Sequence, residues 1–440
     1  MLYGVGGLEG RGRPSKGLER RDATCGSVLE RHGGEAPVEV QLFTNPDRIC
    51  EKLHLGSPSG NSKGGLSPMH VREVVTPGDR ERFIRLPWEI YRQDANWVPP
   101  LISERREFLD PRRNPFFEHA EAKLFLACDD AGALRGRIAA IVNRSHIEQH
   151  REQAGFFGLF ECRDDPEAAA ALFDAAAGFL KSRGMTVMRG PENMSVNDDV
   201  GLLVEGFDSP PAIMMPYNPP YYPALVEARG FRKVMDLYAW YGDSRKTEIP
   251  AKIPRGIELC RRRYGFQVRP IDLRRFDQEI RDIHKVYTQA WEQNWGAVSM
   301  TAKEFDHLAA QLKPVVEPDL CLIAEVRGEV AGFSLALPDF NQALIRLNGR
   351  LLPFGILKLL WYRRKIDMMR VLTTGVIRKF RHMGIDSCFY YETWKRANAK
   401  GIYRAEMSWI LENNDVMNNA LRNLGFRIYK RYRLYDLGLS

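Results

Sequence analysis

The order of predicted secondary-structure elements repeats once along the chain, and this repeat restricts the fold more than any other feature. Apolar residues alternate, or recur at helical spacing, in the order strand, helix, two-strand hairpin, strand, helix, strand. The order occurs in residues 69–244 and again in residues 245–440. Each copy predicts one mixed, mostly antiparallel sheet flanked by helices. The predicted fold class is therefore α/β (α+β), with two related domains.

In the first copy the pattern predicts strands at 69–75, 122–128, 135–142, 155–162 and 186–189 and helices at 79–94 and 167–183. In the second copy it predicts strands at 266–271, 321–326, 331–336, 369–376, 404–410 and 427–434 and helices at 280–294 and 385–399. The polar stretch 243–254, with two prolines, predicts the link between the copies. Residues 1–68 show no sustained period, so we expect a disordered extension or a misplaced start, with Met69 as the alternative start.

Composition excludes several classes of protein. Hydrophobic residues make up 44% and charged residues 27%, as in ordinary globular proteins. No apolar run approaches the roughly 18 residues that a membrane span needs, and the N-terminus does not have the pattern of a secretory signal. The seven cysteines are odd in number and widely spaced. We therefore expect a cytoplasmic protein with buried thiols, without disulfides and without a metal site.

The net charge of +8 favours an anionic partner such as a phosphorylated cofactor, a membrane or a nucleic acid. The apolar and aromatic segment 351–362 is followed by Arg363-Arg364-Lys365, and residues 350–381 hold nine Lys and Arg against one acid. This segment either lies on the anionic inner face of a membrane or is a buried strand or helix with a solvated basic end. Nucleic acid is not expected, because apolar residues outnumber any stacking pattern.

The second copy contains a turn suited to phosphate. The strand ending at Val376 is followed by Arg378 to Asp386, with Gly384 directly before a predicted helix. Such a turn exposes backbone N–H groups at the positive end of a helix dipole and can bind a pyrophosphate. A purely structural strand-to-helix turn remains the alternative.

About thirty residues further on, Asn414 precedes a short helix that ends at Gly425-Phe426. Together with Arg381 and Gly384, this arrangement resembles the GNAT acyltransferase superfamily. The resemblance implies acyl-CoA as co-substrate, no metal, and cofactor-binding residues Val376, Arg381, His382, Met383, Gly384, Ile385 and Asn414. Two positions depart from the pattern: Asp386 stands where a small residue is expected, and Leu421 stands where a Tyr often protonates the leaving thiolate.

The first copy is a degenerate version of the same pattern, because Cys162-Arg163-Asp164-Asp165 replaces the glycine turn. We therefore expect coenzyme A in the second copy and the amine acceptor near the first. Five segments resemble a bacterial GNAT subfamily that contains ceramide synthases: residues 97–100, 114–117, 136–139, 190–207 and 217–222. The likeness runs from about Met69 to the C-terminus and implies a lipid amine as acceptor. The polar loop 190–199 either caps its neighbours or contacts the acceptor. The candidate substrate-binding residues are Asn193, Ser195 and Asn197 in this loop and Tyr222 outside it.

Acyl transfer to an amine needs a carboxylate that removes the ammonium proton. The candidates are Glu161, Asp198 and Glu412, and a surface ion pair is the alternative reading of each. The resemblance to GNAT proteins, which splay two strands to admit the cofactor, implies that backbone N–H groups of residues 372–376 hold the thioester oxygen. Three hypotheses follow: an N-acyltransferase of a sphingoid-type base, an enzyme acting on small polar amines or using aminoacyl-tRNA, and a binding protein without turnover.

Overall fold

The structure, a computed structural model, describes residues 69–247, 249–291 and 295–439. The predicted disordered extension, residues 1–68, lies outside the described residues. Both copies of the predicted element order are present, and their ends differ by a few residues from the expected bounds. The mixed, mostly antiparallel α/β fold is thereby confirmed.

The first copy begins with strand β1 (His70–Glu73) and ends with strand β9 (Arg232–Asp243). Its other strands are β2 (Ala120–Cys128), β3 (Leu134–Asn143), β4 (Ala154–Cys162), β5 (Val187–Gly190), β6 (Glu192–Asn193), β7 (Asp199–Val200) and β8 (Leu202–Glu205). Its helices are α1 (Pro77–Ile90), α2 (Ile102–Phe108), the short η1 (Pro115–Glu118), α3 (Arg144–His150), α4 (Pro166–Ser182) and α5 (Tyr222–Glu227).

The second copy begins with helix α6 (Lys252–Tyr264), so the last residues of the predicted polar link form its first turn. Its strands are β10 (Phe266–Pro270), β11 (Cys321–Val326), β12 (Glu329–Pro338), β13 (Met368–Val376), β14 (Arg404–Leu411) and β15 (Arg427–Gly438). Its other helices are η2 (Leu273–Arg275), α7 (Phe276–Trp291), α8 (Ala302–Leu312), η3 (Pro318–Leu320), α9 (Asn341–Leu344), α10 (Gly355–Tyr362), η4 (Arg363–Lys365), η5 (Arg378–Phe380), α11 (Ile385–Ala399) and α12 (Asp415–Asn423).

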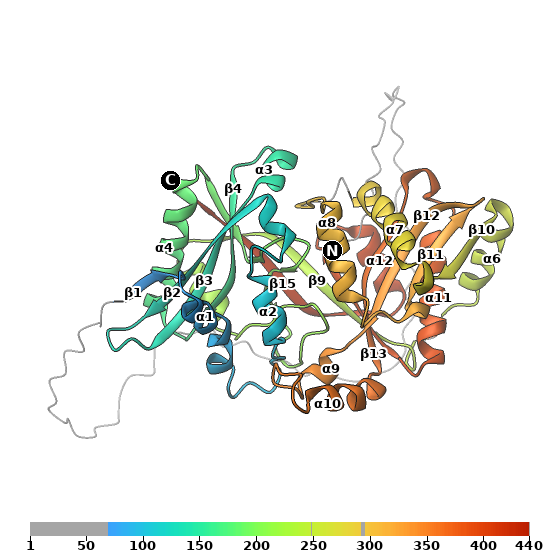
Figure 1. The fold of residues 1–440 in the computed structure, drawn as a ribbon. Coiled ribbons are helices and arrows are strands. Elements are labelled where there is room, and N and C mark those ends of the chain that lie inside the picture. The colour runs from blue at the N-terminus through green and yellow to red at the C-terminus, as the bar shows by residue number, and fades with distance from the viewer. Residues whose placement is uncertain (1–68, 248, 292–294, 440) are drawn as a thin grey trace, which may run out of the picture. The chain divides into compact units, whose positions relative to one another are not determined.

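The two copies share one sheet because their last strands are exchanged. The strand order is β1-β2-β3-β4-β5-β15-β9-β14-β13-β12-β11-β10, and β8 also pairs with β15. Strands β15 and β9 lie side by side where the two copies meet (Figure 1). The last strand of the second copy, β15, pairs with β5 of the first, while β9 of the first copy pairs with β14 of the second. The pairs β4–β5 and β13–β14 are parallel. Each copy therefore completes the sheet of the other.

Helices cover the sheet through apolar cores in both copies. In the first copy the Ala-rich helix α4 buries Leu172, Phe173 and Leu180 against the strands. In the second copy α7 contributes Val286, and α11 contributes Phe389, to a core with β11 and β12. Burying side chains of this size stabilises the fold by about 1.5–3 kcal/mol each.

No helix among the residues that the structure describes has the length and apolarity needed to cross a membrane. Five cysteines fall within these residues, and all five are free thiols. Four of them are buried, and Cys260 is half-buried.

Candidate active site

A gap opens in the sheet where β13 and β14 diverge. Their parallel pairing runs from Met368 opposite Arg404 to Val371 opposite Met407, although β13 continues to Val376. On its other edge β13 stays paired with β12 as far as Val376. The β13 edge from residue 372 to 376 therefore has backbone N–H and C=O groups without a strand partner. Such an edge can pair with an extended amide-containing ligand.

A bulge lies at the start of this gap. Leu335 of β12 is opposite Thr373, and Ala336 is opposite Val371, so Leu372 is the extra residue on β13. Bulges of this kind redirect side chains and are frequent beside active sites. Thr373 is buried, and its Oγ1 has no hydrogen-bond partner among the described residues.

The turn after β13 presents an open helix N-terminus. Gly384 is the N-cap of α11 at φ 78°, and it provides no side-chain cap. The first backbone bond of this turn of helix joins Cys388 N to Gly384 O at 3.0 Å, so the preceding N–H groups have no partner within the helix. The Arg381 guanidinium donates to Val376 O at 3.3 Å and to Ala290 O at 3.2 Å. Asp386, which departs from the expected pattern, is exposed in the first turn.

The corresponding gap of the first copy is filled by its own chain. The pairing of β4 with β5 ends at Phe156 opposite Arg189. Beyond that point β6 lies beside β4, and Asn193 Oδ1 of β6 accepts a hydrogen bond from Leu159 N of β4 at 2.7 Å. A Cβ added at Gly158 would lie 1.9 Å from the carbonyl oxygen of Glu192, so the chains are in direct contact.

The helix after this filled gap is also closed. The carboxylate of Asp165 accepts from Ala168 N at 3.1 Å at the N-terminus of α4, and it pairs with Arg135. A carboxylate already occupies the place where a phosphate would bind. Only the second of these two strand-to-helix turns is therefore open to an anion.

Helix α12 is held by the predicted Asn414. Its Oδ1 accepts from Met417 N at 3.2 Å, which caps the helix. Leu421 is 2% exposed and packs in the core beside Trp240. The position where GNAT enzymes often have a Tyr is thus part of the apolar interior.

The polar loop 190–207 uses its predicted residues for contacts within the protein. Ser195 Oγ accepts from Asn197 N at 3.2 Å. Asn197 Oδ1 accepts from Tyr287 OH at 2.7 Å, and its Nδ2 donates to Val298 O at 2.9 Å. Because Tyr287 lies on α7, Asn197 ties the loop of the first copy to the second copy. Tyr222 is fully buried and donates to Glu161 Oε2 at 2.8 Å.

Two of the three candidate bases already have partners. Glu161 accepts from Tyr91 OH at 2.7 Å as well as from Tyr222. Burial raises the pKa of Glu161. Glu412 accepts from Lys233 Nζ at 2.6 Å and from Asp236 N at 3.1 Å. The hydrogen-bonding capacity of both carboxylates is thus engaged by the fold.

Asp198 is different. It is half-buried, and its carboxylate has no hydrogen-bond or ion-pair partner among the described residues. Burial, together with the neighbouring Asp199, raises the pKa of Asp198 to about 8. A carboxyl group with a pKa near the working pH is suited to proton transfer. Of the three candidates, this carboxyl group alone combines a free acceptor with such a pKa.

A buried polar cluster that the sequence reading missed lies at the base of the gap. Arg370, 2% exposed, donates to Ser408 Oγ at 2.9 Å and lies 3.6 Å from Glu406. Tyr429 OH donates to Glu406. Arg370 also donates to the carbonyl oxygen of Met214 at 2.7 Å, in the first copy. The sequence feature that could have revealed this cluster is an Arg and a Glu inside otherwise apolar strands. Burying such charged side chains costs free energy unless the two are paired.

The segment 351–365 is an exposed apolar surface, which we call the α10 surface. Leu352 is 73%, Phe354 68%, Leu357 65% and Trp361 60% exposed. The basic residues of η4 follow directly, and all three are exposed. The alternative prediction of a buried strand or helix is therefore wrong: the segment is a helix that is anchored through Leu359 and leaves most of its apolar side chains in solvent.

Comparisons with known proteins agree with this fold. The bacterial ceramide synthase of Caulobacter vibrioides is 38% identical over 382 residues, which cover 84% of this chain and 98% of that protein. Protein YghO of Escherichia coli is 36% identical over 373 residues, covering 83% of this chain and 94% of that protein. No protein-family model matches the chain.

Among solved structures, a GCN5-related glucosamine N-acetyltransferase region of a fungal β-N-acetylglucosaminidase has a TM-score of 0.50. It is 14% identical and matches 86% of this chain and 39% of that one, which supports the fold alone. The fold and the curated relatives together define an N-acyltransferase with two GNAT-like copies. The chain belongs to the family of the bacterial ceramide synthase of Caulobacter vibrioides, as the resemblance predicted, and its fold is that of GNAT proteins.

Proposed function

We propose that this enzyme transfers an acyl group from an acyl-CoA thioester to the amino group of a long-chain, sphingoid-type base. The observation that carries the proposal is the contrast between the two copies. The second copy combines a strand gap with an uncapped helix N-terminus, whereas β6 and Asp165 fill the same places in the first. The name of the ceramide synthase relative supports the choice of acceptor.

The residues around Gly384 fit a diphosphate-bearing co-substrate. Backbone N–H groups of His382, Met383, Gly384 and Ile385 would bind the phosphate oxygens, with Arg381 adding positive charge. The unpaired β13 edge, up to Val376, would pair with the amides of the pantetheine arm. Asn414 would act indirectly, because it caps α12.

For the chemical step we assign Asp198 as the base, because its carboxylate is free and its pKa is about 8. Asp198 takes a proton from the ammonium group, and the amine nitrogen then attacks the thioester carbonyl carbon. Backbone N–H groups of the β13 edge hold the carbonyl oxygen as negative charge develops on it. The C–S bond breaks as the amide forms, and the coenzyme A thiolate takes up the proton that the attacking nitrogen loses.

A lipid acceptor requires contact with a membrane, and the α10 surface supplies it in this proposal. Its exposed side chains have the chemistry of an interfacial helix, with apolar and aromatic groups beside a basic flank. Anionic lipid attracts such a flank. We propose that the enzyme binds the inner face of the membrane through this surface and there receives the amine.

The proposed cofactor site predicts the effect of one substitution. Gly384→Asp adds a carboxylate to the phosphate turn at a φ of 78°, a backbone conformation that a side chain disfavours. We expect acyl-CoA binding, measured by titration calorimetry, to weaken at least tenfold. The control, Asp164→Lys, changes an exposed residue before α4 and should leave the affinity unchanged. The reverse pattern would assign coenzyme A to the first copy.

The substrate proposal is tested with a panel of acyl-CoAs against sphingoid bases, short polar amines and no amine. Products are identified by mass spectrometry, and released coenzyme A is measured in parallel. N-acylated long-chain base is the expected product. Acylation of polar amines alone would favour the second hypothesis. Tight acyl-CoA binding without release of coenzyme A would favour a binding protein.

A further inference from the structure

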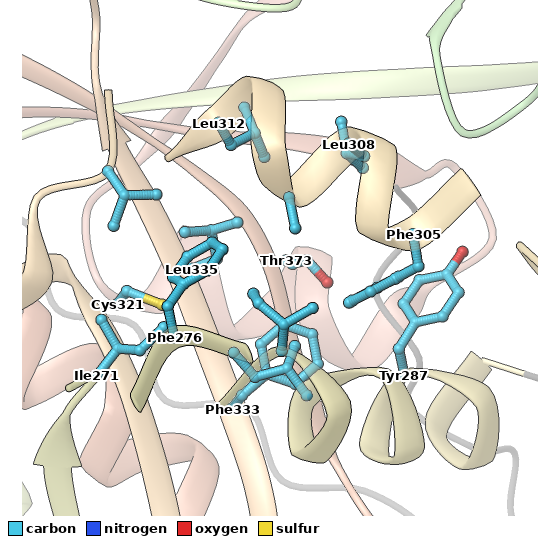
Figure 2. A pocket seen from close by; sticks show the side chains of 14 residues that line it. Ile271, Phe276, Tyr287, Phe305, Leu308, Leu312, Cys321, Phe333, Leu335 and Thr373 are labelled. Carbon is cyan, nitrogen blue, oxygen red and sulfur yellow. The ribbon is translucent and has the colours of Figure 1, made fainter. Parts of the chain in front are cut away.

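An apolar cavity of about 50 Å³ lies between helices α7 and α8 and the sheet of the second copy. Figure 2 shows Leu308 and Leu312 of α8 on one side of it and Phe333 of β12 on the other. Apart from Tyr287, Cys321 and Thr373, the lining side chains are hydrocarbon. A cavity of this chemistry does not hold water well, because water needs two to four polar partners.

The cavity adjoins the strand gap. Thr373 lines it, and Thr373 lies on β13 two residues beyond the last residue paired with β14. Its backbone thus belongs to the unpaired edge, while its side chain faces the cavity. The buried Oγ1 without a partner lies where the two spaces meet. A group bound along the β13 edge at this point has the cavity directly beside it.

The cavity leads away from the gap, and Tyr287 stands between it and the loop 190–207. Its lining passes from Thr373 on β13 through Leu335 on β12 to Cys321 on β11. Two strand spacings amount to about 10 Å. Tyr287 lines the cavity from α7, and its OH is bound to Asn197 of the loop 190–207. Tyr287 therefore separates a chain in the cavity from the loop 190–207, which holds the proposed base Asp198.

We infer that this cavity receives the alkyl chain of the acyl group and so selects acyl-CoAs by chain length. The inference rests on the proposed function, because the thioester must lie along the β13 edge. The free base tail is the competing occupant. It is disfavoured because the tail would have to pass Tyr287 from the acceptor loop. Side chains of α8 that face the cavity, Ala309 and Leu312, then set the depth available to the chain.

Binding of acetyl-CoA and octanoyl-CoA to the full-length protein, measured by titration calorimetry, tests the inference without turnover. Each methylene buried in the cavity should tighten binding about fourfold. The cavity has a third of the volume of one of roughly 150 Å³ that holds benzene, so it takes up about two methylenes, and wild type should prefer octanoyl-CoA roughly 15-fold. Ala309→Leu adds about three carbons and so fills the cavity. The ratio of the two Kd values should therefore fall by the same factor of roughly 15. Both Kd values are measured on the same variant, so a general loss of folded protein does not change their ratio. Leu312→Ala, which enlarges the cavity, should shift the preference toward longer acyl chains.

A second arm varies the chain length of the amine at fixed acyl-CoA and measures kcat/KM for Ala309→Leu. An effect that follows the amine length would assign the cavity to the base and overturn the inference. An unchanged Kd ratio in Ala309→Leu, with octanoyl-CoA still bound, would also overturn it while leaving the acyltransferase proposal intact. Absence of binding of any acyl-CoA to wild type would refute both.

Discussion

Replacing Asp198 with Asn should lower kcat/KM for acyl transfer by about 10²–10⁴-fold, the usual contribution of a general base. The amide cannot take the ammonium proton, but it keeps the size and shape of the carboxyl group. Acyl-CoA affinity should stay the same, because the proposed coenzyme site lies in the other copy. Steady-state kinetics together with calorimetry separate the two effects. Full activity of Asp198→Asn would remove this residue from the mechanism.

The pKa of Asp198 predicts two dependences on pH. Because its pKa is raised to about 8, activity should rise with pH through that value as the base loses its proton. Asp199, Glu304 and Glu104 raise this pKa, and Arg105 lowers it. The matched control Asp199→Asn should therefore retain turnover but move the rising limb to lower pH. A pH–rate profile that does not move in this variant would speak against Asp198 as the titrating group.

The raised pKa of Asp198 also predicts how the stability of the folded protein depends on pH. The carboxyl group is protonated in both folded and unfolded chains below about pH 4, and burying its charged form costs free energy above that pH. The cost grows until pH passes the folded-state pKa of about 8. Asp198→Asn should therefore raise Tm at pH 8 and leave it nearly unchanged at pH 4. A catalytic loss combined with a gain in Tm cannot result from misfolding.

Replacing Arg363, Arg364 and Lys365 with Gln should reduce binding to anionic vesicles by about two orders of magnitude. Each basic residue near an anionic surface contributes about 1 kcal/mol, and three such losses correspond to roughly a 150-fold change. Vesicle co-sedimentation at low salt measures the effect. Activity on a membrane-embedded amine should fall far more than activity on a short soluble analogue.

A matched control for this charge change is available on α6. Arg255, Arg262 and Arg263 are exposed, so changing them to Gln removes the same charge away from the α10 surface. Vesicle binding should then change little. Equal losses in both triple variants would mean that net charge alone attracts the protein. No vesicle binding by wild type would remove the membrane from the proposal and favour a small polar amine.

Local patterns in the sequence predicted the local structure well. Periodicity predicted α4, α11 and the strands β1 to β5 and β10 to β15, since burial on one face imposes a period of 2 or 3.6 residues. The strands β6 to β9 were missed. The turn before α11 could be recognised because Gly384 directly precedes the helix. Helix α8 was missed, although Thr301 and Glu304 form a capping box at its start. That signal spans only four residues, from Thr301 to Glu304.

Long-range contacts could not be predicted in the same way. Nothing local distinguishes β9 and β15 from strands that pair within their own copy, because exchange leaves the alternation of each strand unchanged. The position of β6 in the gap of the first copy also depends on a residue distant in the sequence, because Glu192 packs against Gly158.

The sequence by itself therefore determined the repeat, most of the order of elements, the glycine turn before α11 and the apolar-basic composition of the α10 surface. Only the tertiary structure decided which gap is open, which carboxylate is left without a partner, and which apolar segment faces solvent. The physical reason is that periodicity and capping depend on neighbours within a few residues. Burial, pKa and cavities depend instead on which distant segments pack together, as Asn197 and Tyr287 do.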